Sequence, residues 1–126
     1  MIKKRLLVTD RVRCVPREGF SWIDRRFVRD FAERLSGDAI ALYFFLAAVS
    51  DKQGLSFYRD ASIAARLRMR EAAVVAAREE LLCQDLVAYQ HPLTQVLSLP
   101  RERVARAGLH GLGELMRTLK SLDEEP

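Results

Sequence analysis

Four arginines stand close together near the middle of the chain, and their side chains are suited to binding phosphate. Residues 59 to 70 contain four arginines and one aspartate, and Arg66, Arg68 and Arg70 occupy alternate positions. A guanidinium donates several hydrogen bonds in one plane, which matches the oxygens of a phosphate group. Together with Arg59, these side chains form a candidate anion-binding site.

The chain offers little material for catalysis. Its two histidines, His91 and His110, lie in separate segments, and the sequence has no HExxH, GxSxG, P-loop or GxGxxG pattern. Cys14 and Cys83 are far apart and lack the paired spacing of a zinc site. We therefore expect a binding protein and not an enzyme, with no catalytic residue, metal, cofactor or small-molecule substrate.

The net charge of +4 is unevenly distributed along the chain. Residues 1 to 35 carry ten basic and five acidic side chains, whereas residues 71 to 85 carry one basic and four acidic side chains. Basic charge therefore collects around the four arginines and in an N-terminal arm, where Lys3, Lys4 and Arg5 are candidate second contacts. This distribution favours an anionic partner such as a nucleic acid.

Length and hydrophobicity predict one soluble domain. A chain of 126 residues with 49% hydrophobic residues is long enough to bury a core. The longest uncharged apolar run, residues 39 to 50, is too short to cross a bilayer. We expect a cytoplasmic protein without a membrane partner.

Two helices are predicted in the first half of the chain. Asp24 is a good N-cap for a helix that continues to Leu35, and Ser36 caps a second helix over residues 38 to 50. The second helix is apolar almost all round and is the expected centre of the core. Before it, residues 1 to 23 form a basic arm or an edge strand, and Phe20 and Trp22 are expected to belong to the core.

The second half alternates short strands and helices. A strand is predicted over residues 55 to 58, a short helix capped by Asp60 follows, and a longer helix begins near Arg70. Strands over residues 86 to 89 and 94 to 99 form a hairpin. The fold class is mainly α with a small antiparallel β-hairpin, and residues 101 to 126 form a further helix with a polar tail.

This order of elements resembles the winged helix-turn-helix family. Ser62-Ile-Ala-Ala-Arg-Leu67 and Glu71-Ala-Ala-Val-Val-Ala-Ala-Arg-Glu-Glu-Leu-Leu82 are similar to the two helices of its motif, and Leu86-Val87 is similar to the apolar pair that opens its wing. The region before them more weakly resembles winged-helix domains of bacterial replication-initiation and mobile-element proteins. The resemblance implies a winged-helix domain over residues 24 to 100 that binds double-stranded DNA, in transcription regulation or in replication or transfer of a genetic element.

The resemblance also implies a set of DNA-contacting residues on the two helices, the turn and the hairpin. They are Arg59, Ser62, Arg66, Arg68, Arg70, Glu71, Ala72, Gln90, His91 and Thr94. Two of them depart from the family, which often has Gly at the position of Arg68 and Ser or Thr at that of Arg70. We expect phosphate contact to offset the local cost; the alternative is a turn of different geometry with solvated arginines.

The second motif helix has few side chains that can read bases. Its outer face carries Ala72, Ala73, Val75 and Ala76, so base discrimination should be modest, and Glu79 and Glu80 would repel nearby phosphates. The same apolar face supports an alternative function, a protein-interaction or dimerisation module that does not bind DNA. Its partner would contact residues 72 to 76, and a homodimer would use the helices over residues 24 to 35 and 101 to 122.

Overall fold

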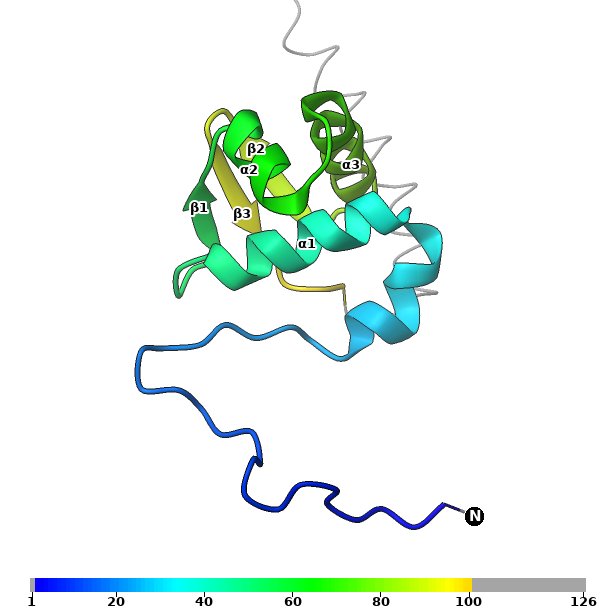
Figure 1. The fold of residues 1–126 in the computed structure, drawn as a ribbon. Helices are drawn as coiled ribbons and strands as arrows, with labels where there is room; N and C mark the ends of the chain where they lie inside the picture. The colour runs from blue at the N-terminus through cyan, green and yellow to red at the C-terminus, as the bar shows by residue number, and fades with distance from the viewer. Residues whose placement is uncertain (1, 101–126) are drawn as a thin grey trace, which may run out of the picture.

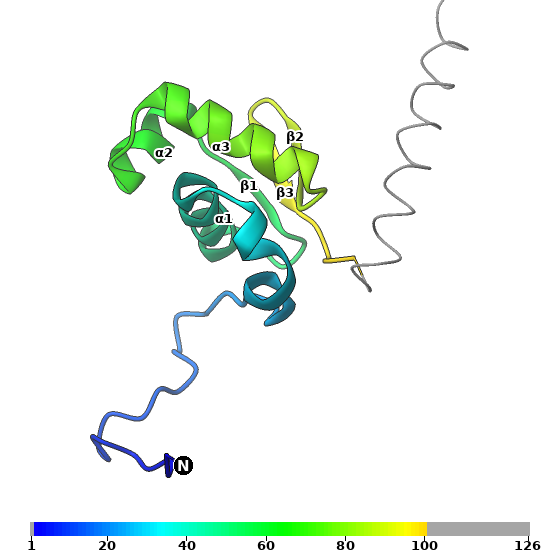
Figure 2. The same cartoon turned by 90° about the vertical axis from the view of Figure 1, so that its right-hand side faces the viewer.

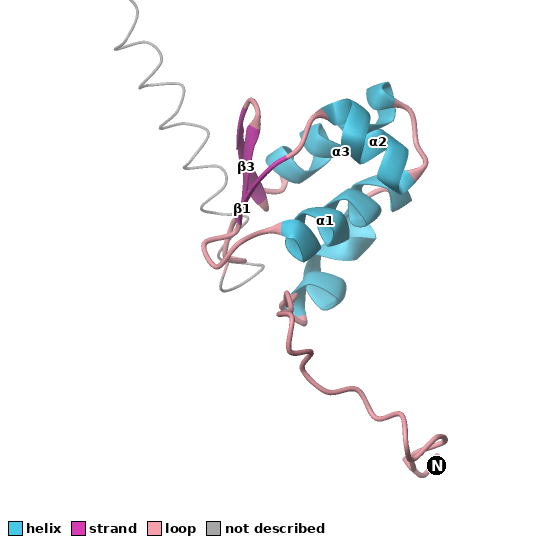
Figure 3. Cartoon of the chain, turned by 60° about the vertical axis from the view of Figure 1, so that its left-hand side comes forward, coloured by secondary structure: helices cyan, strands magenta, loops and turns pink. Residues whose placement is uncertain are grey.

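The computed structural model of the protein describes residues 2–100 of the 126-residue chain. The helix and tail expected over residues 101 to 126 lie outside the described residues. The described chain is mainly helical with a small antiparallel sheet, as the sequence predicts, and Figure 3 shows the helices gathered to one side of the strands. The expected hairpin is present, and a third strand joins it.

Helix α1 (Gly37–Val49) is the centre of the core, as predicted. The Ser36 Oγ accepts a hydrogen bond of 3.1 Å from the backbone N–H of Ala39, which caps the helix. Helix α3 (Glu71–Cys83) packs across α1 (Figure 2). The two helices and their neighbours bury Leu42, Leu46, Val74 and Leu81. Burial of these aliphatic side chains is the main source of stability for a domain of this size.

The prediction of a regular α-helix from Asp24 to Leu35 is wrong. The segment forms a π-helical turn (Phe27–Phe31) and then a 3₁₀ turn (Ala32–Arg34), and Leu35 is extended. The expectation that Asp24 is its N-cap is also wrong, because the N-cap is Arg26 and no side chain caps the turn. The Asp24 carboxylate accepts a 2.9 Å hydrogen bond from the N–H of Arg26 just before the turn. The π-helical turn, which is wider than an α-helical one, places both Phe27 and Phe31 in the core. There the Phe27 ring stacks on the Tyr43 ring, with 4.0 Å between the ring centres.

The sheet contains β1 (Leu55–Phe57), β2 (Val87–Gln90) and β3 (Leu93–Val96), in the order β1-β3-β2. Both pairings are antiparallel, with Ser56 and Tyr89 on either side of Thr94. Gly54 allows the close approach of β1 to β3, because a Cβ at this residue would lie 2.4 Å from the Val96 carbonyl oxygen. The observed ends of the strands differ from the predicted ends by at most three residues.

Helices α2 (Asp60–Leu67) and α3 are joined by the short turn from Arg68 to Arg70. The expectation that Asp60 caps α2 is wrong, because the N-cap is Arg59 and Asp60 is the first helical residue. Its carboxylate instead accepts a hydrogen bond from the guanidinium of Arg78 on α3. That ion pair ties the start of one helix to the middle of the other.

Residues 2 to 23 form an extended arm without a strand, so the edge-strand alternative is wrong (Figure 1). Phe20 and Trp22 are 64% and 75% exposed, which corrects their expected place in the core. The turns over residues 24 to 34 already fill that side of the core with Phe27 and Phe31. Within residues 2–100, no helix has the length and apolarity needed to span a membrane.

Candidate nucleic-acid interface

The turn between α2 and α3 has the left-handed residue that the family resemblance implies. Arg68 has φ 57° and ψ 47°, and the N–H of the following Met69 donates a 3.0 Å hydrogen bond to the Ala64 carbonyl. This six-residue closure is a common helix ending in which glycine usually takes the left-handed position. The alternative expectation, that the turn has a different geometry, is therefore contradicted for this residue.

Helix α3 begins without a side-chain cap. Arg70 is extended, with φ −76° and ψ 153°, and its carbonyl accepts hydrogen bonds from Ala73 and Val74, but no side-chain oxygen receives the first N–H groups. Free N–H groups and the helix dipole create a positive potential at this end of a helix. A Ser or Thr at this position would normally cancel part of that potential by accepting one of these hydrogens.

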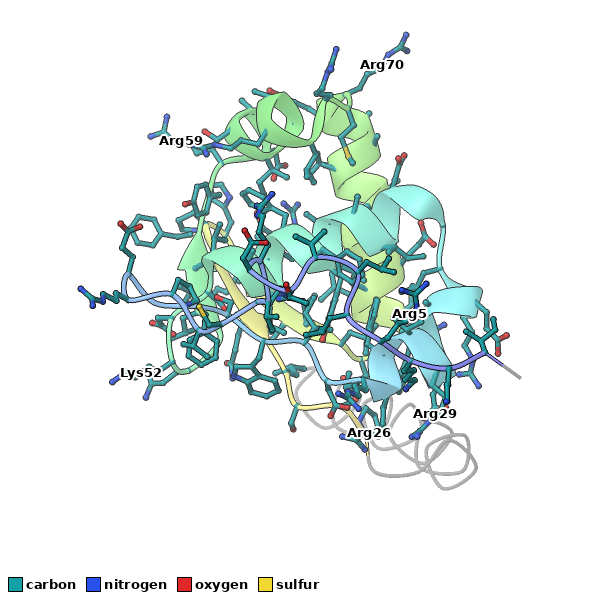
Figure 4. All side chains as sticks on the ribbon, turned by 60° about the horizontal axis from the view of Figure 1, so that its bottom comes forward. Arg5, Arg26, Arg29, Lys52, Arg59 and Arg70 are labelled. Carbon is teal, nitrogen blue, oxygen red and sulfur yellow. The ribbon has the colours of Figure 1, made fainter. Side chains whose placement is uncertain are left out.

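The four candidate arginines on α2 and in the turn after it, Arg59, Arg66, Arg68 and Arg70, are all exposed. Among residues 2–100 the structure gives none of Arg59, Arg66, Arg68 and Arg70 an ion-pair partner. Figure 4 shows Arg59 and Arg70 extending into solvent on the same side of the molecule, near the two ends of α2. Arg66, Arg68 and Arg70 therefore lie at or near the turn that leads into an uncapped helix N-terminus, and Arg59 lies at the other end of α2. Exposed cations beside a helix N-terminus attract polyanions.

The remaining candidate residues on the two helices are also accessible. Ser62 on α2 and Glu71 and Ala72 in the first turn of α3 are exposed. Val75 is 43% exposed and Ala76 is exposed, so the outer face of α3 is small and apolar, as expected. This face has few groups that donate or accept hydrogen bonds.

The two glutamates of α3 differ in their surroundings. Glu79 is exposed, whereas the Glu80 carboxylate accepts a 2.9 Å hydrogen bond from the Ser36 N–H and another from the Ser36 hydroxyl. Glu80 is therefore engaged at the start of α1, near the C-terminal end of α3. Both carboxylates lie at least two helical turns from Arg70, so the one acidic side chain in the first turn of α3 is Glu71.

Arg78 is the residue that sequence reasoning missed. It is only 6% exposed, pairs with Asp60, and lies with its guanidinium carbon 4.0 Å from the centre of the Tyr89 ring. Its spacing was a usable signal, because Arg78 follows Val74 by four residues and precedes Leu81 by three, both on the buried stripe of α3. Arg78 fixes α2, α3 and β2 relative to one another and is not available to a ligand.

The hairpin retains two of its three candidate contacts. Gln90 and His91 are exposed at the tip, and the His91 Nδ1 shares a 2.9 Å hydrogen bond with the Tyr89 hydroxyl. The prediction for Thr94 is wrong, since this residue is 5% exposed. Because β3 is the middle strand, the inner face at Thr94 is covered by its neighbours and by the helices.

The basic arm is not brought together with the four arginines. Lys3, Lys4 and Arg5 are exposed, and Figure 1 shows the arm below the helices, on the side opposite α2. Neither the hairpin nor the α2–α3 turn has a described contact with this arm. The three residues form a separate basic region.

The described residues hold no cluster of three metal-ligating side chains. A scan against protein-family models and searches of the curated proteins and the solved structures give no match to this chain.

Proposed function

We propose that the protein is a winged helix-turn-helix DNA-binding protein, in which α2 and α3 form the motif and β2 and β3 form the wing. The observation that carries the proposal is the uncapped N-terminus of α3, which follows directly on Arg68 and Arg70, with Arg66 and Arg59 farther back along α2. All four arginines are exposed and have no ion-pair partner among residues 2–100. Its role is in transcription regulation or in replication or transfer of a genetic element. Double-stranded DNA supplies the regularly spaced phosphates that such a site binds.

The cost of the turn supports this proposal. A non-glycine residue in the left-handed region costs on the order of 1 kcal/mol, and a missing side-chain cap costs about as much again. A chain that needed only to fold would gain from Gly at Arg68 and Ser at Arg70. Arginine at both positions is accounted for if each guanidinium contacts a phosphate in the complex.

Most of the binding free energy should come from the DNA backbone. The outer face of the first two turns of α3 presents Ala72, Val75 and Ala76, which can contact a thymine methyl but cannot form the bidentate hydrogen bonds that distinguish bases. At the wing, Gln90 and His91 are exposed and can reach the sugar-phosphate backbone. We expect modest sequence preference and strong salt dependence.

The test is fluorescence anisotropy with a random-sequence duplex at several salt concentrations. The slope of log affinity against log salt is about −0.9 for each phosphate neutralised, so four contacts give a slope of roughly −3.6. In the double variant Arg68→Ala/Arg70→Ala the slope should become less negative by about 1.8, with affinity at 0.1 M salt lowered about 60-fold.

Arg34→Ala provides the matched control for that double variant. Arg34 is an exposed arginine two residues before Ser36, which binds Glu80 near the far end of α3 from the turn. Its removal should leave both the slope and the affinity unchanged. Equal losses in the control and in the double variant would contradict a site at the turn, and so would a wild-type protein that fails to bind at low salt.

A protein-interaction or dimerisation module without DNA binding is the second candidate. The specific observation for it is the exposed apolar face of α3, where Val75 lies between the exposed Ala72 and Ala76. Val75→Glu should then abolish association measured by analytical ultracentrifugation. Under the DNA proposal the same variant weakens duplex binding by adding a negative charge and leaves the sedimentation behaviour unchanged.

A further inference from the structure

The most exposed large aromatic side chain near the body of the domain is the tryptophan of the N-terminal arm. Trp22 is 75% exposed and is the single tryptophan in the chain, and Phe20, two residues earlier, is 64% exposed. Exposure of both rings leaves a large apolar area in contact with water, which is unfavourable for the isolated chain. Such a pair of exposed rings on one short segment indicates a ligand that contacts ring faces.

The two rings border a hollow in the surface. A cavity of about 790 Å³ lies between residues 19–26 of the arm, the turn at residues 50–54 and the end of β3 with residues 97–99. Its floor is mostly apolar and includes Tyr43, Ala47 and Val96. Its volume is within the range that proteins use to hold organic ligands.

The arm is anchored at this hollow and does not merely pass over it. The Ser21 hydroxyl donates a 2.9 Å hydrogen bond to the Ala48 carbonyl at the end of α1, so the residue between the two rings is fixed to the body of the domain. Arg26 adds a second attachment, since its guanidinium donates to the Pro100 carbonyl at 2.9 Å. These bonds hold Phe20 and Trp22 at the rim.

The charge of the arm identifies the class of ligand. Residues 2 to 23 carry six lysines and arginines and two acidic side chains. The lining of the hollow itself is balanced, with Arg26 and Lys52 against Asp24 and Asp51, and Arg26 is paired with Asp24. Figure 4 shows Lys52 and Arg26 apart from each other. An apolar peptide would make no use of the cations of the arm, whereas a nucleic acid strand uses both the aromatic rings and the positive charge.

We propose that this surface, the arm with the hollow beneath it, binds single-stranded DNA. Unpaired bases stack on Phe20 and Trp22 with one base entering the hollow, and the phosphates of the strand follow the lysines and arginines of the arm. Paired bases are not available for such stacking, because their faces are covered by neighbouring base pairs. The choice of DNA over RNA rests on the proposed duplex-binding function; the stacking site itself does not depend on it.

Trp22 provides a direct test because it is the sole tryptophan. Oligo(dT) added to the whole protein at low salt should quench Trp22 fluorescence and reduce its quenching by acrylamide. The same titration with a hairpin duplex of equal phosphate number should give a smaller change. Absence of quenching by oligo(dT) overturns the proposal, and a stronger response to oligo(rU) than to oligo(dT) overturns the choice of DNA.

Variants separate stacking from general attraction of the strand. Anisotropy with labelled oligo(dT) should show about a tenfold loss of affinity in Trp22→Ala and recovery of most of it in Trp22→Phe. Phe57→Ala is the matched control, because Phe57 is 73% exposed on β1 and does not line the hollow. An equal loss in Phe57→Ala, or no recovery in Trp22→Phe, overturns a stacking role.

Two further measurements keep this proposal distinct from the duplex site. Arg68→Glu/Arg70→Glu should abolish duplex binding and retain the Trp22 response to oligo(dT), so each site can fail alone. A shift of Trp22 emission with protein concentration, in the absence of DNA, would show that a second copy of the chain covers the rings. That outcome overturns the proposal in favour of a protein contact.

Discussion

Arginine has opposite surroundings on the two sides of the α2–α3 unit. On the inner side, Arg78 is buried, paired with Asp60 and stacked on Tyr89. On the outer side, Arg66, Arg68 and Arg70 are exposed, and the structure of residues 2–100 gives them no ion-pair partner. The comparison separates an arginine that stabilises the fold from exposed arginines, of which Arg68 and Arg70 occupy positions where Gly and Ser would favour folding.

The largest expected effect is on the inner side. Arg78→Met should lower the free energy of unfolding by about 2 kcal/mol, because Asp60 loses its partner and the Tyr89 ring loses a cation. The loss is smaller than for a fully buried pair, since the Asp60 side chain is 30% exposed and can regain water. Urea unfolding measures the change, and Asp60→Asn combined with Arg78→Met should cost less than the sum of the two single variants. A loss below about 0.5 kcal/mol would show that the inner pair is not structural.

On the outer side, Arg68→Gly should stabilise the fold and weaken binding. Glycine adopts φ 57° without strain, so the free energy of unfolding should rise by about 1 kcal/mol. Duplex affinity at 0.1 M salt should fall about eightfold through the loss of one phosphate contact. Thermal unfolding and anisotropy measure the two effects, and Arg68→Ala, which keeps the strain, should lose affinity without gaining stability. Unchanged affinity in both variants would contradict a phosphate contact at this residue.

Arg70→Ser should have a similar but smaller effect on stability. Serine at this extended position can accept a hydrogen bond from the first turn of α3, which should raise the free energy of unfolding by about 0.5 to 1 kcal/mol. Affinity for the duplex should fall through the loss of one cation and of the free N–H group. Arg70→Ala, which can neither cap nor bind phosphate, serves as the comparison for both measurements.

The Asp24–Arg26 pair is partly buried, less than Arg78 and more than the exposed arginines of the α2–α3 turn. Its removal should have the smallest effect on stability. Hydrogen bonds from the Arg26 side chain and backbone hold the pKa of the Asp24 carboxyl below its usual value. A lowered pKa stabilises the folded state above the pKa of the unfolded chain, about 4, and this stabilisation is lost as the pH falls through the folded-state pKa. Asp24→Asn should therefore lower Tm slightly at pH 7, and the difference from the wild type should shrink as the pH falls below about 4.

Local patterns predicted the elements that are stabilised by their own residues. Ser36 as the cap of α1, the apolar length of α1 and the two helices around Arg68 all follow from signals within a few positions of one another. Even the unfavourable φ of Arg68 could be expected, because the closure of α2 depends on adjacent residues alone.

Residues whose surroundings come from distant parts of the chain were predicted poorly. Thr94 is covered because β1, some 40 residues earlier, pairs with β3. Asp60 was expected to cap its own helix, but a partner on α3 takes its carboxylate. Phe20 and Trp22 were expected in the core, and only the irregular turns that place Phe27 and Phe31 there leave the two earlier rings outside.

The attachment of Arg26 to the Leu99 and Pro100 carbonyls brings the described chain back to the place where its compact part begins. Figure 1 shows this meeting point on the side away from α2. The two ends of the compact part are thus close together. A circularly permuted chain, in which a short peptide joins residues 24 and 100 and the new termini lie in the turn at residues 51–54, should keep the same fold. Such a permuted protein would keep the α2–α3 turn and lack the arm. Its binding to DNA would therefore report the contribution of the turn without that of the arm.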